Sequence, residues 1–198
     1  MSDIKKIEMI GTVKEGIGIM FKNAIPLFVN YLLFLLTCWI PYLNVGTRIA
    51  WEVGIIAKLS KGEVIPMTEI FDKKYRKYMG EYFLTNGLVY AGVCVGFLFF
   101  IIPGIVIMFS WLFASMITID KGKNPAESIS LSNHATYGNK GRIFGIYFLL
   151  FLVAGIVSGI LSLIPVAGII LILLLWACVS LWCIGMLASI YRQLTSNI

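Results

Sequence analysis

Residues 143–190 read IFGIYFLLFLVAGIVSGILSLIPVAGIILILLLWACVSLWCIGMLASI, two long apolar runs joined at Pro165. The stretch contains no acidic or basic residue, and it is about twice as long as the ~20 apolar residues that cross a bilayer as one helix. A proline between the two runs breaks a helix and favours a turn. The stretch therefore predicts a hairpin of two membrane helices.

The same unit occurs three times along the chain. Pro41, Pro103 and Pro165 each follow an isoleucine, lie 62 residues apart and interrupt an apolar stretch, and a Gly-x-x-Phe sequence precedes each stretch. A fixed period of this kind indicates a repeated architecture. We expect one membrane domain over 1–198, built from three tandem repeats of an amphipathic helix plus a transmembrane helical hairpin, and we expect each proline at a hairpin tip. The predicted repeats cover residues 1–62, 63–123 and 124–198.

The composition favours an all-α integral membrane protein. Hydrophobic residues make up 59% of the chain and charged residues 13%, and the mean hydropathy is +0.90. A soluble domain of this length could not bury so much apolar surface. Some predicted spans are shorter than a bilayer requires, so they either cross a thinned bilayer or stop short as wedges. The six predicted spans are 24–40, 42–58, 82–102, 104–119, 143–163 and 166–190.

The position of the basic residues predicts the orientation. Almost all of them lie between the hairpins or near the chain ends, and none lies at the three tips. The positive-inside rule then places both termini and both long loops in the cytoplasm, with the chain as a multi-pass protein of the plasma (inner) membrane. The basic residues form no stripe interleaved with aromatic residues, so we expect no nucleic-acid partner.

Residues 67–79 have the pattern of an interfacial helix. Phe71 and Tyr75 share a stripe with Met67 and Tyr78 at helical spacing, and a basic face opposes them. Such a helix lies in the headgroup layer. We expect contact with lipids of the anionic cytoplasmic leaflet from Phe71, Lys73, Lys74, Tyr75, Arg76 and Lys77. The alternative is a structural collar on the helical bundle.

Two other segments open the remaining repeats. Residues 7–17 carry isoleucine and valine at helical spacing. Asn124-Pro125-Ala126-Glu127 reads as an N-cap, a proline at the first helical position and a capping-box acid. A glycine after a helix commonly ends it, so we expect this helix to stop at Gly138.

Polar residues occur inside the first predicted hairpin. Arg48 and Glu52 are four residues apart on its second arm, and antiparallel arms would bring Asn30 to the same depth. Charges inside a membrane face the protein interior and pair. Asn30, Arg48 and Glu52 therefore form either a polar element of a binding or permeation path or a lock between the arms. The positions one repeat later are not ionisable, which favours the lock.

Part of the chain resembles a known family. Ile102-Pro103-Gly104, the capping sequence from Asn124, Gly141-Arg-Ile-Phe144 and Tyr191-Arg-Gln-Leu194 are similar to sequences in YciC-type inner-membrane proteins and in the membrane domain of some glycerophosphoryl diester phosphodiesterases. The resemblance implies a six-span helical fold. It implies no phosphodiesterase activity, because a separate soluble domain carries that activity.

The sequence predicts no enzyme. The chain has a single histidine, its four cysteines lie in apolar spans without metal-ligand spacing, and no carboxylate pair or nucleophile–base pattern is found. We expect no cofactor and no metal. The predicted function is to organise or shape the membrane, with membrane lipids and a second copy of the chain, or a membrane complex, as partners. The alternatives are a small transporter or channel and an accessory subunit.

Overall fold

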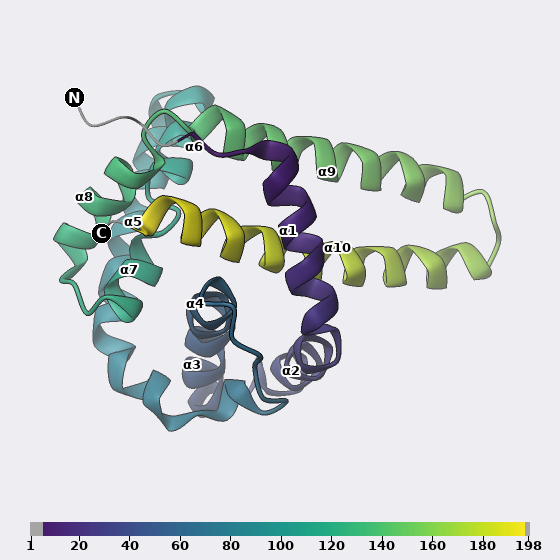
Figure 1. Ribbon diagram of the computed structural model, residues 1–198, viewed down its shortest axis with the longest axis horizontal. Coiled ribbons are helices and arrows are strands. Elements are labelled where there is room, and N and C mark those ends of the chain that lie inside the picture. The colour runs from purple at the N-terminus through teal and green to yellow at the C-terminus, as the bar shows by residue number, and fades with distance from the viewer. Residues whose placement is uncertain (1–5, 197–198) are drawn as a thin grey trace.

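The structure is a computed structural model that describes residues 6–196, and these residues form helices and connections without a strand. Figure 1 shows their arrangement. In chain order the elements are α1 (Met9–Lys22), α2 (Ala24–Thr37), α3 (Pro41–Ile49), the π-helix η1 (Ala50–Gly54), α4 (Ile55–Ser60), the 3₁₀-helices η2 (Glu69–Phe71) and η3 (Lys73–Tyr78), α5 (Met79–Phe99), α6 (Ile101–Ser110), α7 (Ala114–Asp120), α8 (Pro125–Thr136), α9 (Lys140–Leu161) and α10 (Ala167–Thr195).

Four helical segments are long and apolar enough to cross a membrane: Lys73–Phe99, Ile101–Asp120, Lys140–Leu161 and Ala167–Thr195. The number rises to five if α1 and α2, which meet at an angle of 78°, count as one broken span. The all-helical fold and several long apolar helices agree with the sequence analysis and are compatible with a membrane protein. The prediction of six spans is not confirmed.

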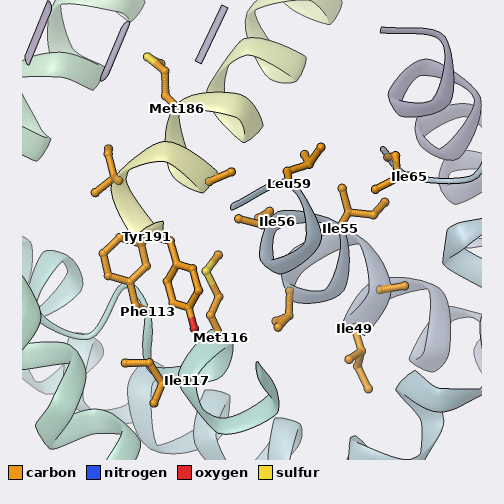
Figure 2. Packing of buried hydrophobic residues seen from close by; sticks show 14 of the residues in the cluster. Ile49, Ile55, Ile56, Leu59, Ile65, Phe113, Met116, Ile117, Met186 and Tyr191 are labelled. Carbon is orange, nitrogen blue, oxygen red and sulfur yellow. The ribbon is translucent and has the colours of Figure 1, made fainter. Parts of the chain in front are cut away.

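The predicted span over 42–58 is absent from these candidates, because Arg48, Glu52 and Lys58 make α3, η1 and α4 less apolar than the other long helices. We call these residues, 41–60, the central helix. Ile49, Ile55 and Leu59 are fully buried, and Figure 2 shows α4 between Ile65 on one side and Phe113, Met116 and Tyr191 on the other. Each such aliphatic side chain contributes about 1.5–3 kcal/mol when buried. Other segments of the protein therefore enclose most of the second half of the central helix, from residue 49 to residue 60.

The break between α6 and α7 is held by α8. Ser132 Oγ accepts the Phe113 N–H at 3.1 Å and donates to the Ser110 carbonyl at 2.9 Å, and Thr136 donates to the same carbonyl. These hydroxyls replace helical hydrogen bonds that the break removes. As predicted, α8 begins at Pro125, and Asn124 Oδ1 accepts the Glu127 N–H at 2.8 Å. Gly138, with φ of +75°, follows its end.

The helices α1 and α10 cross in direct backbone contact (Figure 1). A Cβ atom built on Gly185 would lie 2.3 Å from the Gly16 carbonyl oxygen, and one on Gly16 would lie 2.8 Å from the Met186 nitrogen. Two buried glycines thus allow the crossing. Polar contacts surround it, because Glu15 accepts a hydrogen bond from Ser189 and pairs with Arg192.

The hairpin of α9 and α10 extends away from the other helices, with its turn at the far right of Figure 1. Its outer part is largely exposed, and a Cβ atom on Gly155 or Gly159 would meet nothing within 4 Å. Val166, next to Pro165 in the turn, has φ of +58°. This hairpin therefore presents an apolar surface that no other described residue covers.

The helices of the first and third predicted hairpins run in different directions (Figure 1). In Figure 1, α9 and α10 lie in the plane of the view, whereas α2 and α4 are seen nearly end-on. The second arms also differ: one contains a π-helix, the next breaks after Ser110, and α10 continues without a break. Pro41 begins α3, Pro103 lies in the first turn of α6, and Pro165 precedes α10. The threefold repeat stays a prediction.

We predict that Gly185→Ala lowers the free energy of unfolding, because the added methyl group clashes with the backbone of α1. Overpacking of this kind typically costs about 1–3 kcal/mol. Gly159→Ala is the matched control, since it makes the same change in a helix with open space around it. Thermal unfolding in detergent measures the difference. Equal melting temperatures for the two variants would contradict the close crossing of α1 and α10.

Candidate functional site

Charged side chains gather along the central helix and its neighbours. We call this set the polar strip, and it has three clusters. The first is Arg48, Glu52 and Tyr82, the second is Lys58, Glu69, Lys74 and Tyr75, and the third is Lys61, Asp120 and Tyr191.

The first cluster contains the ion pair of the predicted polar element. Arg48 Nε lies 2.8 Å from Glu52 Oε1, and the Tyr82 hydroxyl donates to the other carboxylate oxygen. The two side chains are 43% and 35% exposed, respectively. Glu52 lies in η1, where the Ile55 N–H donates to the Ala50 carbonyl in the wider π-helical turn. Short π-helices are frequent at functional sites, so the cluster is a candidate for function.

Asn30 does not join this cluster, which corrects the predicted grouping of Asn30 with Arg48 and Glu52. Its fully buried amide accepts the Ile70 N–H at 3.0 Å and donates to the Pro66 carbonyl at 2.9 Å. Asn23 accepts the Ile65 N–H in a similar way at 3.2 Å. Both asparagines satisfy buried backbone groups of the segment between α4 and η3. Their role depends on where that segment lies, so spacing along α2 alone could not reveal it.

The second cluster is centred on Glu69, whose side chain is 2% exposed. Its carboxylate lies 2.8 Å from Lys58 Nζ and 3.1 Å from Lys74 Nζ, and it accepts the Tyr75 hydroxyl at 2.5 Å. Burial alone would raise the pKa of Glu69, but hydrogen bonds from Lys58, Tyr75 and Lys74 outweigh burial and hold this pKa below its ordinary value. Glu69 is therefore an anionic centre that joins α4 to η3.

The segment 67–79 is not the amphipathic α-helix that its spacing predicts. It contains the 3₁₀-helices η2 and η3, and the Asp72 side chain caps η3 by accepting the Lys74 N–H at 3.0 Å. A 3₁₀-helix has three residues per turn, so positions spaced for an α-helix leave their common face. Tyr75 is consequently buried against Gly54, whereas Phe71 stays exposed.

The basic residues of this segment divide between two environments. Lys73 and Lys77 are exposed, as lipid contact requires. Lys74 instead pairs with Glu69 and Asp72, and the Arg76 guanidinium lies over the Tyr42 ring at 5.0 Å. The collar alternative therefore describes most of the segment better than the interfacial one.

The third cluster joins three separate parts of the chain. Lys61 Nζ lies 2.5 Å from one oxygen of Asp120, and the Tyr191 hydroxyl donates to the other at 3.1 Å. Asp120 is mostly buried, and it connects the end of α7 with α10 and with the residue after α4. This cluster was not predicted from the sequence, since its members lie in three different predicted repeats.

Between the second and third clusters lies a cleft of about 240 Å³. Lys58, Lys61 and Lys74 line it together with Glu63 and Asp120, so its wall carries both ammonium and carboxylate groups. Among residues 6–196, no group of three or more His, Cys, Asp or Glu side chains is placed to hold a metal ion. The three lysines of the cleft already form ion pairs with Glu69 or Asp120, so the charges in the cleft are largely satisfied within the protein.

In comparisons with known proteins, no family model, no curated protein and no solved structure matches this chain. The resemblance to the YciC-type family therefore stays a prediction, and the candidate site rests on its own geometry.

We predict that Glu69→Gln lowers the free energy of unfolding by about 1.5–3 kcal/mol, the contribution of a hydrogen bond to a charged group. The loss of stability is no larger because Lys58 and Lys74 are partly exposed, so water can solvate their ammonium groups in the variant. The pKa of Glu69 is lowered, so its stabilisation is present above about pH 4 and is lost as the pH falls through the lowered pKa. Unfolding at several pH values should show a weaker acid dependence for the variant.

Glu81→Gln is the control for this experiment, because Glu81 is exposed. It should leave both the stability and its pH dependence close to those of the original chain. If Glu69→Gln also behaved in this way, Glu69 would not be the anionic centre of the second cluster.

Proposed function

We propose that this chain is a non-enzymatic multi-pass membrane protein that organises or shapes the membrane. The observation that carries the proposal is the projecting hairpin of α9 and α10. No acidic or basic residue occurs from Ile143 to Tyr191, and most of the outer side chains are large, apolar and exposed. A surface of this size and composition requires lipid or another apolar partner.

The bend between α1 and α2 supports the same proposal. Two apolar helices at 78° suit a chain in which α1 lies in the headgroup layer and α2 enters the bilayer. Lys14 and Lys22 on the exposed side of α1 would then face anionic headgroups. In this proposal the membrane is the plasma (inner) membrane, and both termini are cytoplasmic. A hairpin beside an interfacial helix inserts unequal volumes into the two leaflets, which is how the chain would act on shape.

Self-association is part of the proposal. Gly155 and Gly159 lie on α9 with open space around them, and small residues four positions apart let membrane helices approach closely. A second copy of the chain, or another membrane protein, would pack along this side of α9. The relation to YciC-type proteins is proposed on the sequence resemblance alone.

The test is reconstitution of the purified protein into vesicles that contain anionic phospholipid, followed by electron microscopy. We expect tubes or small vesicles at high protein density. Leu173→Lys should strongly reduce them, since Leu173 is 67% exposed on α10 and a charge in the bilayer core costs about 2.5–3.5 kcal/mol. Leu173→Ala is the control that keeps the surface apolar. Vesicles that remain spherical with the original chain would exclude this function.

A transporter or channel is the second candidate, favoured by one observation. The pair of Arg48 and Glu52 is only partly buried and lies at a π-helix, where the backbone departs from regular α-helical geometry. We propose that, if the chain conducts protons or ions, Glu52 lies on the path. Flux into vesicles measured with a pH-sensitive or ion-sensitive dye should then be lost in Glu52→Ala and kept in Glu81→Ala. Absence of flux with the original chain would end this candidate.

A further inference from the structure

An apolar groove of about 520 Å³ lies where α1 crosses the base of the projecting hairpin. Side chains of α1, α9 and α10 line it, including Val13, Leu149, Val153 and Trp182. Clefts of this volume bury small ligands in other proteins. The groove is separate from the polar strip, which lies along the central helix.

We propose that this groove binds one acyl chain of an anionic phospholipid, and that Lys14 binds its phosphate. Of the described residues that line the groove, Lys14 alone is ionisable, and all the others are apolar or aromatic. Lys14 is exposed and forms no ion pair within residues 6–196. A long apolar wall with a single cation at its rim matches the chemistry of a lipid with an anionic headgroup.

The surroundings of the groove favour a lipid over a soluble ligand. Leu149 and Val153 belong both to the groove and to the exposed apolar face of α9. An acyl chain can therefore enter the groove from the bilayer without crossing polar groups. The headgroup would remain at the level of α1, next to Lys14.

The groove is held open by fixed contacts. The Trp182 indole N–H donates to the Val13 carbonyl at 3.3 Å, which fixes the ring against α1. The close crossing at Gly16 and Gly185 holds α1 on α10 beside the groove. A preformed groove avoids the cost of ordering the protein, so one lipid should stay bound when detergent removes the others.

The test is native mass spectrometry of the delipidated protein in detergent with added phosphatidylglycerol or phosphatidylcholine. We expect one phosphatidylglycerol to bind more tightly than phosphatidylcholine. Lys14→Ala should weaken the binding of phosphatidylglycerol about fivefold, equivalent to ~1 kcal/mol for one basic residue at an anionic lipid. The binding of phosphatidylcholine should stay unchanged. Lys14→Arg should restore the preference. Lys123→Ala, which removes a partly exposed lysine outside both the groove and the predicted lipid-contact segment, is the matched control.

A second pair of variants tests the apolar part of the groove. Val153→Trp should fill the groove and abolish binding of both lipids, whereas Leu173→Trp, on the same hairpin but outside the groove, should not. If Val153→Trp does not fold, the native protein still tests the site, because phosphatidylglycerol with brominated chains should quench Trp182 fluorescence. Comparison with Trp182→Phe identifies the part of the quenching that comes from Trp182.

Two results would overturn the proposal. One is equal phosphatidylglycerol binding by the original chain, Lys14→Ala and Val153→Trp. The other is a lipid-free dimer that Val153→Trp dissociates, which would assign the groove to a second copy of the chain. The inference rests on the proposed membrane role only in that lipid surrounds the chain. Binding is measured without vesicles, so failure of membrane shaping and failure of the lipid site are distinguishable.

Discussion

The fold depends on the pairing of charges around a helix that lies inside it. The central helix brings arginine, glutamate and lysine into a chain that is otherwise very apolar. Glu69 pairs with Lys58 of this helix, and Asp120 pairs with Lys61, the residue that follows it. Removing one partner from such a contact leaves a poorly solvated charge. The polar strip thus specifies which segments can surround the central helix, while apolar packing supplies most of the energy.

The long apolar helices were predictable from the sequence, and the central helix was not. Hydropathy and proline spacing located α5, α9 and α10 to within a few residues. The same pattern assigned 42–58 to the membrane, because a buried helix and a lipid-facing helix are both rich in apolar residues. Three ionisable residues on one helix, Arg48, Glu52 and Lys58, distinguish this helix from the long apolar helices in the sequence. Their number was more informative about burial than the position of any one of them.

The candidate site was predictable only where it is local. Arg48 and Glu52 pair across one helical turn, as their spacing indicates, and the cap at Asn124 forms as expected. Asn30 was misassigned, since its partners are backbone groups 36 and 40 residues away. The prediction for residues 67–79 was wrong for a different reason. An α-helical period was assumed for a segment that a cap and buried contacts hold in 3₁₀-helices. Contacts between distant segments, including those that form the apolar groove, require the tertiary structure.

The crossing of α1 and α10 has a consequence for how the protein is made. Glu15 and Ser189 are separated by 174 residues, so α1 leaves the ribosome long before its partner helix exists. At about 5–20 residues per second, this interval is roughly 9–35 s. During that time the glycine face of α1 lacks α10. In the proposed membrane setting, lipid or the insertion machinery would cover it until synthesis reaches α10, which makes this crossing a late step of biogenesis.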